Sequence, residues 1–251
     1  MTKPQTWASS EVAPGIPHFD TAPFNWYVVE QDSRLTLVDA GFPGHYRVFR
    51  KGIDSLGFSP KDVEAIVLTH AHADHIGFAE RVRRESGAPV FVHKKDARMA
   101  QRPLQLPWLA LLSNAWRPPV AKMLVIATTN GVFKCSRLKE VQAIEDGQTL
   151  DVPGRPVVHH TPGHTAGEIV LHFPQRRALI SGDALVTRQL YSGEQGTPQL
   201  TPPALNSDFK QACESLRSLS SLGELTILSG HGTPWTGDIA EAVDIAISNA
   251  R

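Results

Sequence analysis

The chain has 251 residues, a length that suits one large α/β unit, and we expect residues 1–251 to form a single domain. Lys plus Arg and Asp plus Glu number 25 each, so a net charge of zero gives no long-range attraction to nucleic acid or to an anionic membrane. We therefore expect no nucleic-acid or membrane partner. The chain has two cysteines, no signal-peptide core at its N-terminus and no long apolar run, and these features predict a soluble cytoplasmic protein.

The first predicted elements are two strands, 24–30 and 35–39, and the polar turn between them indicates a hairpin. Apolar residues then recur at helical spacing over 46–56, up to a glycine that ends the pattern. The apolar, β-branched run 65–69 predicts a buried strand. A β-β-α unit therefore precedes this strand.

Four side chains that can bind metal follow directly within six residues: His70, His72, Asp74 and His75. In extended backbone, residues i and i+2 point to the same side, so His70 and His72 can hold one ion together. Asp74 and His75 lie just before a helix predicted from Ile76 and can reach a second ion. A polar loop with a chance cluster of histidines is the alternative, and few contexts favour such a cluster. The run predicts two neighbouring metal positions.

Beyond this run the chain continues to alternate between strands and helices. After a strand at 89–93, the stretch 97–134 is apolar but interrupted by prolines, and we expect an irregular insert. Further strands are predicted at 157–161, 168–173, 178–181 and 225–228. A helix is expected after the N-cap residue Asp208 and another over 239–247. The alternation indicates an α/β architecture with two sheets.

Three more ligand-type residues, His164, Asp183 and His231, lie beside glycine where predicted strands end. An H-x-H-x-D-H run followed by TPGHT-type, GD-type and GH-type motifs in this order resembles the metallo-β-lactamase superfamily over about residues 20–236. The resemblance implies a four-layer αββα sandwich with two metals at one edge between the sheets. Within the superfamily, the aspartate Asp183 favours the glyoxalase II-like and lactonase-like branches.

The resemblance also implies the role of each ligand. His70, His72 and His164 would bind the first metal, Asp74, His75 and His231 the second, and Asp183 would bridge them. In the family, an aspartate matching Asp39 commonly orients a metal ligand without touching the metal. An Asx-type turn after the strand explains the presence of Asp39 equally well. Imidazole and carboxylate ligands favour zinc, with iron or manganese as alternatives, so we expect two divalent ions.

Two adjacent cations can share a water whose lowered pKa makes hydroxide available at neutral pH, and we expect this metal-bridging hydroxide to attack the substrate. Asp74 would also orient the water and pass a proton to the leaving group. Asp183 argues against a true β-lactamase, since those enzymes generally lack that carboxylate. We therefore predict hydrolysis of a carboxylic ester, lactone or thioester. Homoserine lactones fit less well, because the first tyrosine after Asp183 is Tyr191, later than in lactonases of the family.

The insert offers an apolar surface near the metals. Its segment around Trp108 could form a lid over a small-molecule substrate with an apolar acyl part. A packed surface helix or a homodimer contact is the alternative. On the side of the metals opposite the insert, Arg188 and Tyr191 are predicted to contact the substrate.

Three other functions remain open from the sequence. A mononuclear iron oxygenase of the persulfide dioxygenase type uses the same scaffold with part of these ligands, and a phosphodiesterase or β-lactam hydrolase uses it with other substrates. A binding module with an inert metal site is the third. Counting metals and assaying a broad substrate panel would distinguish them.

Overall fold

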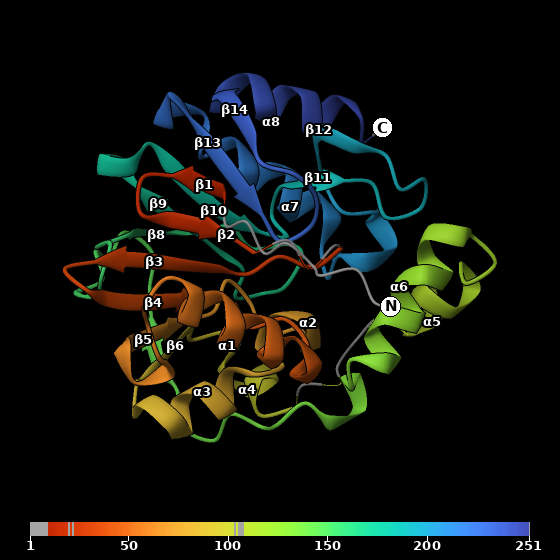
Figure 1. The fold of residues 1–251 in the computed structure, drawn as a ribbon. Coiled ribbons are helices and arrows are strands. Elements are labelled where there is room, and N and C mark those ends of the chain that lie inside the picture. The colour runs from red at the N-terminus through yellow and green to blue at the C-terminus, as the bar shows by residue number, and fades with distance from the viewer. Residues whose placement is uncertain (1–9, 20, 22, 103, 105–107, 251) are drawn as a thin grey trace.

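Two β-sheets face each other at the centre of the molecule, and helices cover their outer faces (Figure 1). The computed structural model describes residues 10–19, 21, 23–102, 104 and 108–250. The predicted lack of a signal peptide concerns residues that lie mostly outside this range. None of the helices that the structure describes combines the length and the apolarity needed to cross a bilayer.

The larger sheet has seven strands and the smaller has five. The larger contains, in order, β1 (Ser10–Ala13), β2 (Ile16–His18), β3 (Tyr27–Gln31), β4 (Arg34–Val38), β5 (Val63–Val67), β6 (Val90–His93) and β7 (Gln142–Ile144). The smaller contains β14 (Trp235–Asp238), β13 (Glu224–Ser229), β10 (Ala178–Gly182), β9 (Ile169–Phe173) and β8 (Val157–His160). A separate ribbon pairs β11 (Val186–Arg188) with β12 (Gln195–Gln199).

The helices lie outside the sheets and in the insert. They are α1 (Tyr46–Ser55), α2 (Ala73–Ile76), α3 (Ala79–Ser86), α4 (Ala97–Ala100), α5 (Trp108–Ser113), α6 (Pro118–Thr129), α7 (Phe209–Arg217) and α8 (Ile239–Ser248). Short 3-10 helices occupy Pro43–His45, Pro60–Asp62, Val132–Lys134, Pro174–Arg176, Pro203–Leu205 and Ser220–Leu222.

Successive side chains of the strands point to opposite layers, which produces the sandwich. In β3, Val28 packs in the cluster that includes α1 and α3, whereas Val29 packs between the two sheets. In β9, Leu171 packs in the same cluster as Val29 between the two sheets, whereas Val170 packs against α7 and α8 on the other face of its sheet. The layers therefore run helix, sheet, sheet, helix, and the predicted four-layer αββα sandwich is confirmed.

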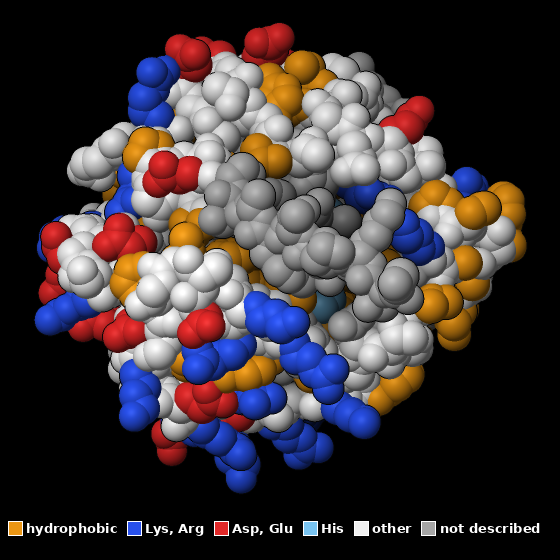
Figure 2. All heavy atoms as spheres, viewed as in Figure 1, with side chains coloured by type: hydrophobic (Ala, Val, Ile, Leu, Met, Phe, Trp, Pro, Cys, Tyr) orange, Lys and Arg blue, Asp and Glu red, His pale blue; other side chains and the backbone are white. Residues whose placement is uncertain are grey.

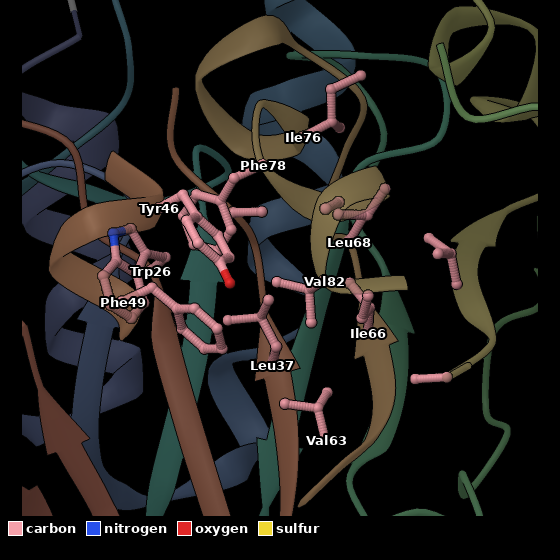
Figure 3. Close-up of a cluster of buried hydrophobic side chains, with 14 of the residues drawn as sticks. Trp26, Leu37, Tyr46, Phe49, Val63, Ile66, Leu68, Ile76, Phe78 and Val82 are labelled. Atoms are coloured by element: carbon pink, nitrogen blue, oxygen red, sulfur yellow. The ribbon is translucent and has the colours of Figure 1, made fainter. Parts of the chain in front are cut away.

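Aromatic side chains hold α1 on the larger sheet. Figure 3 shows Tyr46 and Phe49 of α1 beside Trp26, which precedes β3, and Val82 of α3 near Ile66 of β5. The rings of Trp26 and Phe49 meet edge to face with their centroids 5.8 Å apart. Burial of such large rings contributes strongly to the stability of a domain. This layer fixes the strands whose ends carry the first histidines.

Parallel pairing brings several strand ends to one edge. β4 pairs with β5 in parallel, and β10 pairs with β13 in parallel. Carboxyl ends of neighbouring parallel strands lie side by side, and this edge is where α/β sheets place ligands. Asp39 and His70 therefore follow neighbouring strands of one sheet, and Asp183 and His231 follow neighbouring strands of the other.

The prediction of an irregular insert at 97–134 is wrong. The structure forms α4, α5 and α6 there, while residues 103 and 105–107 lie outside the described residues. Pro118 and Pro119 occupy the first positions of α6, where a backbone N–H has no partner within the helix and a proline fits without cost. These prolines begin a helix instead of breaking one.

The helix predicted from Ile76 is divided into α2 and α3 at Gly77. A Cβ atom at this glycine would lie 2.3 Å from the carbonyl oxygen of Gly41, so only glycine allows the two loops to approach. The backbone N–H of Gly77 instead donates a hydrogen bond of 2.7 Å to that oxygen. The break holds α2, with Asp74 and His75, against the end of β4.

Candidate metal centre

Three buried imidazoles form the first group at the sheet edge. His70 and His72 follow β5, and His164 lies in the turn between β8 and β9. Nδ1 of His72 is 3.0 Å from Nε2 of His70 and 3.0 Å from Nε2 of His164. Three nitrogens thus converge on one point from two distant parts of the chain.

Burial keeps these imidazoles neutral. It is the largest cause that lowers the pKa of His164 to about 3, and burial with the neighbouring histidines lowers the pKa of His70 well below its usual value. A neutral imidazole has a free lone pair on one ring nitrogen, which is the form that binds a metal. The first group is therefore ready to accept a cation near neutral pH.

The second group consists of Asp74, His75 and His231. Oδ2 of Asp74 lies 3.8 Å from Nε2 of His75 and 3.5 Å from Nε2 of His231. The candidate ligand atoms of each group lie within 4.8 Å of one another. Both groups therefore have the dimensions of an ion site.

Asp183 lies between the two groups. Its Oδ2 is 3.4 Å from Nε2 of His164 and 3.2 Å from Nε2 of His231, and its Oδ1 is 3.5 Å from Nε2 of His75. Burial alone would raise the pKa of Asp183, but His231 and His75 lower it well below the usual value. One ionised carboxylate thus faces both groups, and the structure brings together all seven side chains that the sequence singled out.

The outer nitrogens of the histidines have partners of their own. Nδ1 of His75 is 2.9 Å from Oδ2 of Asp39, and the backbone N–H of Thr69 donates to Oδ1 of Asp39 at 2.8 Å. Nδ1 of His231 donates to the carbonyl oxygen of Pro23 at 2.7 Å. Such contacts fix the orientation and tautomer of a ligating imidazole. The Asp39 side chain therefore reaches across the sheet edge to the next loop.

Two carboxylates at the site were missed by sequence reasoning. Asp96, after β6, accepts hydrogen bonds from Oγ1 of Thr165 at 2.8 Å and from the backbone N–H groups of Ala71 at 3.2 Å and Gly167 at 2.7 Å. It thereby joins the loop of His70 and His72 to the loop of His164. The available signal was a single aspartate three residues after a predicted strand.

Glu168 is the second missed residue. Its side chain is fully buried, its Oε1 accepts from the backbone N–H of Asp183 at 3.0 Å, and its Oε2 is 3.3 Å from Nδ1 of His70. Burial, with Asp183 as a second cause, raises the pKa of Glu168 well above the usual value. A carboxylate as the first residue of a predicted buried strand was the signal that could have found it.

The polar atoms at the centre fit a metal pair. Nε2 of His75 and Oδ1 of Asp183 are buried and have no hydrogen-bond partner among the described residues. Buried polar atoms in folded proteins are almost always paired, so these two atoms call for a ligand. Imidazole nitrogens and carboxylate oxygens are the ligands that zinc, iron and manganese prefer. The residues present therefore fit two divalent cations.

An apolar cavity opens above the two groups. His72, Asp74 and Asp183 form part of its base, and its walls are mostly apolar side chains of the insert and of the loops beside it. The walls include Phe24, Phe42, Trp108, Leu111, Met123 and Leu124. Arg188 is the one lysine or arginine among the described residues that line it.

The three residues predicted to contact substrate lie in different places. Trp108 and Arg188 line the cavity. Tyr191 lines a separate depression beside β12, and its ring centroid is 5.3 Å from Cζ of Arg117 in the insert. The structure therefore brings two of the three to the cavity above the metal groups.

The sequence of this chain is similar to a family model and to known proteins. The family model described as "Metallo-beta-lactamase superfamily" matches residues 22–231. The chain belongs to this superfamily. Among its relatives in the superfamily, the "Probable metallo-hydrolase YflN" of Bacillus subtilis (strain 168) is 27% identical over 250 residues, which cover 94% of this chain and 91% of the relative.

Solved superfamily structures share the fold. The metallo-beta-lactamase family protein TTHA1429 from Thermus thermophilus matches with a TM-score of 0.66 and 24% identity over 92% of this chain and 77% of that one. TTHA1623, solved in a di-iron-bound form, matches with a TM-score of 0.61 and 23% identity over 91% of this chain and 96% of that one. At these identities the likeness shows the metallo-β-lactamase fold and leaves the substrate open.

Proposed function

We propose that this protein is a dinuclear metal-dependent hydrolase that cleaves a carboxylic ester, lactone or thioester with an apolar acyl part. The observation that carries the proposal is the complete set of seven ligand side chains at the base of an apolar cavity, with Asp183 facing both groups. A mononuclear site would need only part of this set. Zinc is the metal we expect first, since imidazoles predominate among the ligands.

Two divalent cations held by these residues would supply a nucleophile from water near neutral pH and positive charge beside the developing negative oxygen. Asp74 faces the cavity, and its Oδ2 lies on the side of His231. We assign to the Asp74 carboxylate the orientation of the attacking water and the transfer of its proton to the leaving group. Asp39 and the Pro23 carbonyl hold His75 and His231 in the required orientation.

The walls of the cavity support an acyl substrate. Phe24, Phe42, Leu111 and Met123 would surround an alkyl chain and exclude water from it. Arg188 would contact the polar part of the substrate, because it is the one strongly basic side chain among the described lining residues. This arrangement favours a substrate with one polar, reactive end and one apolar end.

The test is a panel of esters, thioesters and lactones of increasing acyl length, assayed with protein loaded with zinc, manganese or iron. Each methylene that enters the cavity should raise kcat/KM by up to about fourfold. Metal analysis should give about two ions per chain. No turnover at full loading, or about one iron per chain with oxygen uptake, would contradict the proposal and favour the inert site or the iron oxygenase.

A further inference from the structure

The charge of the chain is unevenly distributed. Between Asp96 and Glu140 there is no acidic residue, and this basic segment, residues 97–139, carries seven basic ones. They are Arg98, Arg102, Arg117, Lys122, Lys134, Arg137 and Lys139. None of them takes part in the ion pairs of the part of the chain that the structure describes, which join other lysines and arginines to carboxylates. The net charge of the chain is zero, but the basic segment 97–139 is strongly cationic.

The same segment exposes most of the large apolar side chains on the surface. Of the large hydrophobic residues that are exposed in the described part of the chain, all except Leu56 belong to it. Leu109 is 85% exposed, Trp116 74% and Phe133 64%. Figure 2 shows apolar side chains gathered over α5 and α6 at the right of the view, with lysine or arginine side chains beside them. Soluble surfaces rarely gather apolar groups in this way without a partner.

The two faces of α5 have different surroundings. Trp108 and Leu111 line the cavity above the metal groups, whereas Leu109 and Leu112 point to the outside. Trp116 lies in the turn between α5 and α6, with Cζ of Arg117 4.5 Å from its ring centroid. An exposed tryptophan beside a cation is typical of a protein surface that meets the headgroup region of a bilayer.

We propose that the described residues of the basic segment 97–139 dock on an anionic lipid bilayer, with Leu109, Leu112 and Trp116 inserted at the interface. Uncompensated lysines and arginines are attracted to anionic headgroups, and leucine and tryptophan side chains partition below them. The docking does not depend on the proposed hydrolase activity. It would, however, place the cavity wall that carries Trp108 next to a source of apolar substrates.

A second copy of this chain is a less suitable partner. A two-fold dimer through this surface would bring the same side chains of both copies together. Arg117, which lies over the Trp116 ring, and Lys122 of α6 would then lie near the same residues of the other copy, and like charges across an interface oppose association. A lipid surface covers the leucines and tryptophan and neutralises the charges at the same time.

The experiment measures binding of the full chain to vesicles by flotation. We expect binding to vesicles of phosphatidylcholine with phosphatidylglycerol, weak binding to phosphatidylcholine alone, and loss of binding at high salt. Replacing Lys122 and Arg137 with Gln should weaken binding roughly fivefold for each charge removed. The matched control replaces Lys51 and Lys61, which are exposed elsewhere, and should bind as the wild type does.

A second set of variants removes the apolar groups. The combined variant Leu109→Ser, Leu112→Ser, Trp116→Ser should lose vesicle binding, whereas Leu56→Ser should keep it. Trp116→Leu should still bind but lose most of the blue shift of tryptophan emission that vesicles produce. Circular dichroism checks that each variant is folded.

Three outcomes would overturn the docking proposal. The first is no binding to either vesicle. The second is equal binding to anionic and neutral vesicles, because the basic residues would then have no part in it. The third is a dimer in lipid-free solution that the triple serine variant converts to a monomer, because the partner would then be a second copy. None of these outcomes depends on turnover, so the proposed hydrolase is tested separately.

Discussion

The metal loops and the insert differ in how they are held. The loops are joined by backbone hydrogen bonds between the sheets, such as Ile169 N–H to the oxygen of Thr69 at 2.9 Å, and within one sheet, such as Gly230 N–H to the oxygen of Gly182 at 2.8 Å. In the insert, α4 packs in the main core through Ala100, whereas α6 is attached by a small apolar cluster and is followed by Asn130, whose oxygen accepts from Gly44 N–H at 2.9 Å. In the proposed hydrolase, reaction chemistry would therefore depend on the hydrogen-bonded loops, and substrate preference on a segment that can change without disturbing them.

The largest effect should come from the hydrogen-bonded metal loops. Asp183→Asn removes the charge that faces both groups, and we expect the pair of metals to be lost and kcat to fall about a thousandfold or more. Metal analysis and steady-state kinetics measure both effects. Asp151→Asn, at a side chain that is 95% exposed, is the matched control and should change neither. Retention of two metals with full turnover would remove Asp183 from the centre.

The junction between the two regions contains His45, which is buried beside Phe24 and Phe42. Burial lowers the pKa of His45 from 6.5 to about 4, so the folded state keeps it neutral where the unfolded state takes up a proton. Stability of the metal-free protein should therefore fall as the pH drops from 6.5 to 4, by about 3 kcal/mol from this group. Well above the unfolded-state pKa the group contributes no pH dependence.

Urea unfolding at several pH values, with a chelator present, measures this contribution. In His45→Gln, that part of the slope between pH 6.5 and 4 should be missing. His172→Gln is a partly exposed control and should keep most of the slope. An identical slope in the wild type and His45→Gln would show that His45 is not held neutral.

Asp96 is not a proposed metal ligand, but it holds together the loops that carry His70, His72 and His164. Asp96→Ala would leave three hydrogen-bond donors without their acceptor, and we expect metal affinity to fall about ten- to hundredfold. Competition with a chromophoric chelator measures this affinity. Asp54→Ala, at an exposed residue, should have no effect. Unchanged affinity in the Asp96 variant would limit its role to stability.

The smallest effect should come from the insert and should depend on the substrate. Leu124→Trp fills the cavity and should lower kcat/KM about tenfold for long acyl substrates, with little change for short ones. Leu112→Trp places the same ring on the outer face of the insert and serves as the control. Equal losses for long and short substrates would mean that the cavity does not hold the acyl chain.

Sequence reasoning reached the seven ligand residues because four are adjacent in the chain and three stand beside glycine at strand ends. The alternation of strands and helices indicated an α/β architecture with two sheets, and the resemblance to the metallo-β-lactamase superfamily implied the sandwich. Asp96 and Glu168 escaped it, because their partners are distant: Asp96 and Gly167 are 71 residues apart. Local patterns cannot reveal a contact that exists only after the sheets have stacked.

The insert and the ribbon were missed for another reason. Pro118 and Pro119 indicated a break, although a proline at the first position of a helix is favourable. The strand β12 contains Gly196 and Pro198, residues that are depleted in strands. The tertiary environment overrides these local preferences in both places.

The first group of imidazoles joins distant parts of the polypeptide, since His72 and His164 are 92 residues apart and belong to loops of different sheets. A cation shared by them would act as a removable cross-link between the two halves of the sandwich. Because a ligand that binds only the native state shifts the unfolding equilibrium, thermal resistance should follow the supply of metal in the medium. Metal scarcity would then limit the lifetime of the protein as well as its chemistry.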